Sequence, residues 1–488
     1  MIALTALSLS CAGSGPAPEP LRIGLPAGIP GIDPHRHVDH HSYSVLSNAY
    51  EGLVRIGHDL RIEPALAERW ESPHDRLWRF RLRRGVLFHT GQQMTADDVV
   101  ASIERARTRA SGGAGGYVSG ISGARAVDPL LVELTLDEAD QGLLGRLASV
   151  AVLPSNVPDE ITESSGTGPY VLSVQGGAIE LTAFAGYWGP APPEPRALLE
   201  PLDDPTGRRR AGPKLELHVQ PGLAPEDAPL LSRIMGVRLR SQHTPAVSYL
   251  QMRVDVAPFS DRRVRQAIHL ALDREALVRS MLLGYGRPAS QFVSPEIFGF
   301  DPDAAPAVRD VATARRLLAE AGYPDGLDVE LEVRHGRPVA GLVAQLAEVG
   351  IRVTPAARTW TEILGRLDEG KVPFHYAGFV SATGDASALL ESTAYTRGRR
   401  AGFGELNHMG YSSAAVDALI DEARRTNDAR ARRRAFQECQ RRLLEDLPLI
   451  PVLSPDDLHA VREEIRWEPR LDGRLLIAEM SRITRGPM

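Results

Sequence analysis

Four histidines lie within seven residues near the N-terminus, and imidazole is a common ligand of late transition metals. They are His35, His37, His40 and His41, with Asp33 and Asp39 beside them. Their spacing fits no fixed zinc pattern, and the segment follows Pro34, so we expect it to begin as a loop. A solvated polar loop is therefore favoured over a metal site, and we expect no tightly bound metal and no cofactor.

Motifs for covalent or hydrolytic catalysis are not convincing. Residues 120–124 resemble a nucleophile elbow, but Ala124 stands where the motif requires glycine. The sequence contains neither a Walker phosphate-binding loop nor a His-Glu-x-x-His segment. A binding protein is thus favoured over an enzyme, with a secreted hydrolase as the weaker alternative.

The surroundings of Cys11 suggest a site of lipid attachment. It follows a short apolar stretch, residues 1–10, and precedes the small residues of 12–15. That order resembles a bacterial lipoprotein signal, although no Lys or Arg precedes the apolar stretch and Ser8 replaces the usual Leu. We expect an exported protein, periplasmic or at the cell surface, held to the membrane by a lipid on Cys11. The alternative is an N-terminal tail with an incidental cysteine.

Length and charge limit the classes of partner. The 488 residues exceed what one hydrophobic core usually serves, so two or three lobes are expected. The formal charge of -6 gives no reason to expect a nucleic-acid partner.

Alternating and helical patterns predict a chain that mixes strands and helices. Strands are expected at 21–25, 77–82, 132–136, 215–219, 327–333, 351–353 and 374–378. Helices are expected to begin near Thr95, Asp261, Asp310, Val339 and Thr359. The strand–helix–strand order over 327–353 favours a βαβ unit. Residues 111–123 and most of 190–229 are expected to form loops.

Several short motifs follow one another along most of the chain. They are Asn48 to Leu53, Pro64 to Trp70, Trp78 to His89, Thr95 to Val99, Thr167 to Tyr170, Tyr187-Trp188, Pro258 to Arg274 and Ala314 to Tyr323. Together these motifs resemble family 5 of the extracellular solute-binding proteins, the peptide- and nickel-binding components of ABC importers.

The resemblance implies an α/β, two-lobed periplasmic-binding-protein fold of type II, the Venus-flytrap fold, with an extra inserted small lobe. The signal and tether would occupy residues 1–20. The discontinuous first lobe would comprise 21–52, 153–240 and 459–488. The small lobe would cover 53–152 and the second lobe 241–458. A ligand would bind between lobes that close by hinge motion.

Candidate ligand contacts follow from the same resemblance. They are Tyr43, Trp360, Phe379, Ser381, Asp385 and Phe403. In peptide-binding relatives an Asp after the strand pairs with the ligand's amino group, and Ala382 stands at that position here. Leaving an ammonium unpaired in a closed cleft is costly. Ordinary peptides are therefore expected to bind weakly unless Asp385 or another acid substitutes.

The expected function is capture of a small solute for an ABC importer, with the permease subunits as protein partners. The solute could be peptide-like, an amino-acid derivative, a metal chelate or sugar-like, and the protein is expected to be monomeric. A sensor or scavenging protein of the same fold, not coupled to transport, is the alternative.

Overall fold

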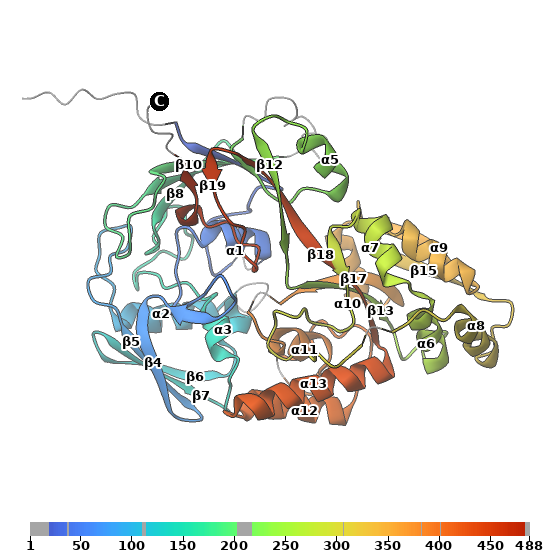
Figure 1. Ribbon diagram of the computed structural model, residues 1–488. Coiled ribbons are helices and arrows are strands. Elements are labelled where there is room, and N and C mark those ends of the chain that lie inside the picture. The colour runs from blue at the N-terminus through green and yellow to red at the C-terminus, as the bar shows by residue number, and fades with distance from the viewer. Residues whose placement is uncertain are drawn as a thin grey trace, which may run out of the picture.

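The computed structural model describes residues 19–36, 39–109, 114–202, 217–305, 307–381, 383–400 and 402–483. Figure 1 shows two halves side by side, one formed by the blue-to-teal segments and the other by the yellow-to-orange second lobe. Among the described helices, none is both long and apolar enough to cross a membrane.

One mixed sheet runs through both halves. Its described part has 12 strands, in the order β16-β15-β17-β13-β18-β11-β1-β10-β9-β8, with β12 and β14 attached to β18. Strand β18 (Leu449–Arg462) pairs with β13 (Ala246–Met252) near its start and with β12 (Val237–His243) near its end. In Figure 1 it runs diagonally from one half to the other. The halves are thus joined by β18 and by the short connection between β12 and β13.

The first lobe is built around the predicted strand at 21–25. This strand, β1 (Leu21–Leu25), is fully buried at Leu21, Ile23 and Leu25 and pairs in parallel with β10 (Arg196–Pro201). Strand β10 falls where only loops and one strand at 215–219 were expected, so that expectation was wrong. Of the strand expected at 215–219, residues 215 and 216 lie outside the described part, and among the rest only Val219 belongs to a strand. The other elements are α1 (His40–Leu46), β8 (Tyr170–Gln175), β9 (Ala178–Ala183), β11 (Val219–Gln220), η2 (Pro225–Asp227), α5 (Ala228–Leu231), β19 (Ile465–Arg466), η3 (Ile477–Glu479) and β20 (Ser481–Arg482).

The small lobe forms its own antiparallel sheet, in the order β4-β5-β7-β6. The predicted alternation is confirmed in β5 (Leu77–Leu82), where Trp78, Phe80 and Leu82 are buried. The loop expected over 111–123 was wrong in its described part, because its residues enter a 3-10 turn and then β6. The remaining elements are β2 (Val54–Ile56), β3 (Ile62–Pro64), β4 (Ala67–His74), α2 (Ala96–Arg107), η1 (Ala114–Val118), β6 (Ile121–Asp128), β7 (Leu131–Leu136) and α3 (Leu143–Leu147).

The second lobe contains the predicted βαβ unit. Strands β15 (Leu327–Arg334) and β16 (Ile351–Arg358) pair in parallel and are connected through α9 (Ala340–Glu348). Helix starts were also predicted correctly, since the side chains of Asp261 and Asp310 accept backbone N–H bonds at their N-caps. The other elements are α6 (Arg262–Ala271), α7 (Arg274–Leu282), β14 (Gly286–Pro288), α8 (Val311–Glu320), α10 (Trp360–Asp368), β17 (Phe374–Val380), α11 (Ser387–Thr393), α12 (Ala414–Arg425) and α13 (Ala429–Asp446).

The small lobe and the second lobe touch through a buried ion pair. Nη2 of Arg424, on α12, lies 2.9 Å from Oδ2 of Asp140, and the two side chains are 5% and 2% exposed. Arg146 also pairs with Asp140. Apolar side chains of both lobes, including Leu143 and Leu389, share one buried cluster around this contact. The structure therefore holds these two lobes against each other.

We expect Arg424→Met to favour separation of the two lobes. Removing one partner of a buried charge pair costs up to about 3–5 kcal/mol, and Arg146 should reduce that loss by remaining on Asp140. The variant should melt at a lower temperature and show a larger radius of gyration in small-angle scattering. Arg425→Met, which changes the exposed neighbour, is the matched control. Unchanged melting and scattering in the Arg424 variant would show that this contact does not hold the lobes together.

Candidate ligand-binding site

A cavity of about 250 Å³ opens in the second lobe where two strands of the sheet separate. Strands β15 and β17 are bridged only at Glu332 and His375. Beyond that bridge the chain after β15 diverges from β17, and α10 lies over the gap through Trp360 and Leu367. The strand ends therefore leave a crevice of the kind in which α/β proteins place ligands.

Aromatic side chains form much of the cavity wall. They are Tyr249, Trp360, Tyr376 and Phe379. Tyr249 and Tyr376 are 4% and 3% exposed, whereas Trp360 is 47% exposed at the mouth. The structure thus brings together two of the predicted contacts, Trp360 and Phe379. A large apolar side chain left exposed beside a cavity provides surface for a ligand to cover.

Two arginines give this cavity a positive charge. The guanidinium of Arg337 lies 5.2 Å from the centre of the Tyr376 ring, and Nη1 is 3.4 Å from both Ser248 Oγ and the Ala377 carbonyl oxygen. Arg334 is exposed at the same cavity. No carboxylate of a described residue lies in contact with either arginine, and no acidic residue lines the cavity.

The two histidines of the cavity remain neutral near pH 7. Burial, aided by the charge of Arg337, lowers the pKa of His375 to about 4. Burial also lowers the pKa of His408, with Arg397 acting in the same direction. The positive charge therefore belongs to the arginines, whose sign does not change over the physiological pH range.

Three predicted contacts lie away from this cavity. Ser381 is 1% exposed, and its backbone N–H donates to the Pro245 carbonyl at 3.1 Å. Asp385 is ion-paired with Arg432 and accepts the Ser387 N–H at 2.7 Å, so its charge is already compensated. Phe403 is buried against Tyr395, with ring centres 5.0 Å apart. Ala382 lies outside the described residues.

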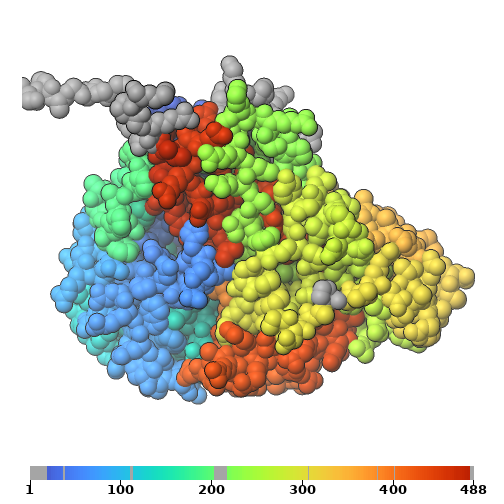
Figure 2. Space-filling model, in the orientation of Figure 1, coloured from blue at the N-terminus to red at the C-terminus, as the bar shows by residue number. Residues whose placement is uncertain are grey.

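Tyr43 lines a different cavity, of about 500 Å³, between the first and small lobes. The segments around it meet on the face shown in Figure 2, where blue, teal and red surfaces adjoin. The Tyr43 hydroxyl donates to the Ala148 carbonyl oxygen at 2.9 Å. Glu51 in this cavity accepts hydrogen bonds from Thr167, Tyr187 and Trp188. Burial nevertheless raises the pKa of Glu51 to about 7.

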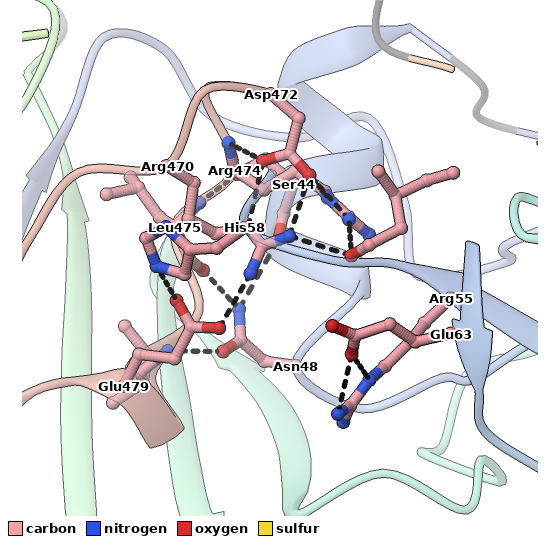
Figure 3. A network of polar contacts seen from close by, with 12 residues as sticks. Ser44, Asn48, Arg55, His58, Glu63, Arg470, Asp472, Arg474, Leu475 and Glu479 are labelled. Atoms are coloured by element: carbon pink, nitrogen blue, oxygen red, sulfur yellow. Dashed lines mark hydrogen bonds and ion pairs between the residues drawn. The ribbon is translucent and has the colours of Figure 1, made fainter. Parts of the chain in front are cut away.

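A dense ion-pair network closes one side of the 500 Å³ cavity (Figure 3). Asp472 lies between Arg470 and Arg474, with the Nε atoms 2.9 and 2.8 Å from its carboxylate oxygens. Burial alone would raise the pKa of Asp472, but Arg474 and Arg470 lower it to about 2. Glu479 accepts from Arg470 and approaches His58. Because these charges compensate one another, we interpret the network as structural.

The histidine segment is dispersed in the structure. The segment begins as a turn at Pro34 and His35, in agreement with the loop expected at its start, and His40 and His41 then lie in α1. His35 is buried with Nε2 2.8 Å from the Ala151 carbonyl oxygen, and burial lowers its pKa to about 4. His37 lies outside the described residues. No cluster of three or more His, Cys, Asp or Glu side chains suited to a metal occurs in the described part of the chain.

Sequence reasoning missed the residues that give the cavity its charge. Arg334 ends a strand that was predicted correctly and Arg337 follows it, so their position at a strand end was a usable signal. Tyr249 and Tyr376 lie within strands, where an aromatic residue is predicted to pack in the hydrophobic core. Their approach to the arginines depends on the separation of β15 from β17, which sequence patterns do not encode.

The architecture is that of the type II periplasmic binding proteins, and the chain belongs to a known family of them. Residues 61–400 match the bacterial extracellular solute-binding proteins, family 5 Middle. The chain is therefore a solute-binding protein of the kind that serves ABC importers, and the family resemblance inferred from its motifs is confirmed.

Relatives with assigned ligands cover nearly the whole chain. The glutathione-binding protein GsiB of Escherichia coli K12 is 28% identical over 471 residues, covering 92% of this chain and 91% of its own. The binding protein MoaA of A. tumefaciens R10, solved with mannopinic acid, is 25% identical with a TM-score of 0.79 and coverage of 96% and 100%. A dipeptide-binding protein of Pseudoalteromonas sp. SM9913, solved with Met-Leu, is 20% identical with a TM-score of 0.83 and coverage of 95% and 100%.

Proposed function

We propose that this protein captures a small acidic solute, binds its carboxylate at Arg337, and delivers it to the permease of an ABC importer. It acts as a monomer and performs no reaction on the solute. Import is favoured over a sensor or scavenging role because the family match spans most of the chain.

The observation that carries the ligand class is the uncompensated guanidinium of Arg337. Arg337 contacts only a hydroxyl, a carbonyl and an aromatic face, whereas Asp472 at the other cavity is paired with two arginines. A partly desolvated cation without an anion is unfavourable. A ligand carboxylate would supply that anion through two parallel N–H···O bonds, which arginine geometry favours.

The aromatic wall complements the charge. Trp360 and Tyr376 offer apolar surface for the carbon skeleton of the ligand, while Arg337 orients its acid group. Apolar walls combined with a few orienting polar groups are typical of small-molecule sites. One relative is named for glutathione and another was solved with mannopinic acid, and both solutes are acidic, which supports the same class here.

Lobe closure would couple binding to delivery. A ligand can shift the balance between open and closed forms only by making contacts that differ between them. The Arg424–Asp140 pair, which links the small lobe to the second lobe, would act together with such ligand contacts.

The ligand class is tested by calorimetry on wild type, Arg337→Gln and Arg279→Gln. The panel contains glutathione, mannopinic acid and a neutral dipeptide amide. At least one acid should bind wild type, lose tenfold or more in affinity in Arg337→Gln, and keep its affinity in the exposed-site control. Tight binding of the amide, or an acid whose affinity is the same for wild type and Arg337→Gln, would contradict the proposal.

We further propose that a lipid on Cys11 anchors the protein outside the cytoplasm. This rests on the small residues after Cys11 and on the extracellular character of the family. Expressed in a bacterial host with its own leader, wild type should partition into the detergent phase and Cys11→Ala into the aqueous phase. Equal partition of both forms would contradict lipid anchoring.

A further inference from the structure

One part of the second-lobe cavity carries polar side chains that the described protein leaves without full partners. Tyr249 and His375 line the cavity and are 4% and 3% exposed. No described residue hydrogen-bonds with the Tyr249 hydroxyl or with either ring nitrogen of His375, and Nδ1 of His375 is buried. Gln251, also in the lining, makes one long hydrogen bond, from Nε2 to the Leu406 carbonyl oxygen at 3.4 Å. We call Tyr249, Gln251 and His375 the polar row.

Strand pairing explains why the polar row forms one group. In the antiparallel ladder between β13 and β17, Gln251 lies opposite His375, and Tyr249 lies opposite Ala377. Residues two apart on a strand share a face of the sheet, and directly opposed partners do so as well, so these side chains are neighbours. Ala377 also lines the cavity, and its single methyl group leaves room opposite Tyr249.

The guanidinium of Arg337 lies close to the polar row. Its Nη1 is 3.4 Å from the carbonyl oxygen of Ala377, which is two residues from His375 on β17. Two residues of strand span about 7 Å. A small solute can therefore place its carboxylate at Arg337 and a second polar group at the polar row.

The polar row offers neutral hydrogen-bonding groups. Burial, with the charge of Arg337, lowers the pKa of His375 to about 4, so the imidazole is uncharged near pH 7. Burial raises the pKa of Tyr249, so its hydroxyl keeps its proton. A neutral imidazole has one donor and one acceptor nitrogen, and a phenol hydroxyl can act in either way. A hydroxyl or carbonyl oxygen of a ligand matches these groups, whereas a hydrocarbon chain would leave them desolvated and unpartnered.

We infer that the polar row selects acids that carry a second oxygen, in a hydroxyl or carbonyl group, over acids with an apolar chain. The inference rests on the proposed function, because Arg337 would hold the carboxylate of the same solute. A site built to hydrogen-bond a polar group strongly rejects an analogue that lacks it, because the polar groups of the site lose water and gain no partner. Arg337 would thus set the acidic class, and the polar row would set the choice within that class.

The volume of the cavity limits the size of such an acid. At about 250 Å³ it lies just below the common range for ligand pockets, about 300–1,000 Å³. Trp360 and Phe379 supply apolar lining for the carbon atoms of the solute. Short sugar acids and amino-acid amides combine a small size, a carboxylate and a further oxygen, and they are the compounds that this cavity fits.

The test uses two matched pairs of acids in calorimetry. Gluconate is compared with hexanoate, and glutamine with norleucine, so that each pair shares a carboxylate and differs in the polar groups of its chain. Wild type should prefer gluconate or glutamine over its apolar counterpart by about tenfold or more. Tyr249→Phe and His375→Leu should each lower this preference by about threefold or more, because an apolar chain then leaves one polar group fewer without a partner.

Matched controls separate specificity from general damage. Tyr323→Phe and His74→Leu make the same changes outside the cavity lining and should keep the wild-type preference. Arg337→Gln should weaken both members of each pair alike and leave the preference between them. Tyr249→Phe should melt no lower than wild type, because the hydroxyl it removes bonds to no described residue.

Three outcomes would overturn the inference. Equal affinity within each pair, or a preference that both cavity variants keep, would do so while the dependence on Arg337 stands. A lower melting temperature of Tyr249→Phe would assign that hydroxyl to the fold and not to the ligand. Binding of none of the four acids would also overturn it, and if glutathione and mannopinic acid fail to bind as well, the proposed ligand class fails with it.

Discussion

The continuity of β18 is the constraint on which the rest of this structure depends. Its first residues, such as Ile450, pack in the core of the second lobe, while Val461 near its end packs in the core of the first. One strand thus belongs to two cores, and only the β12–β13 connection accompanies it across. Lobes joined in this way can change their angle about the junction when the cluster shared by the small and second lobes separates, which is the property that a closing binding protein needs.

Charge is distributed unevenly over this frame. Most charged groups are compensated within the protein, as in the Arg470–Asp472–Arg474 network and the Arg432–Asp385 pair. Arg334 and Arg337, at the second-lobe cavity, contact no carboxylate of a described residue. An acidic solute would supply the missing counter-charge.

The sequence predicted the local elements better than the site. Alternation over Leu77–Leu82 and the capping residues Asp261 and Asp310 act within a few residues, so they could be identified directly. Strand β10 was missed because its Pro- and charge-rich surroundings are typical of loops. Arg337 becomes significant only through Ser248 and Tyr376 beside it, which come from distant parts of the chain. Its lack of a counter-charge is a tertiary property that no local pattern encodes.

A crystal structure of the protein with a bound acidic solute would test this account most directly. The account predicts carboxylate oxygens of the solute about 3 Å from the Arg337 guanidinium, with the carbon skeleton against Trp360 and Tyr376. A solute located only in the cavity beside Tyr43, or one bound in the second-lobe cavity with no anionic group at Arg337, would contradict it.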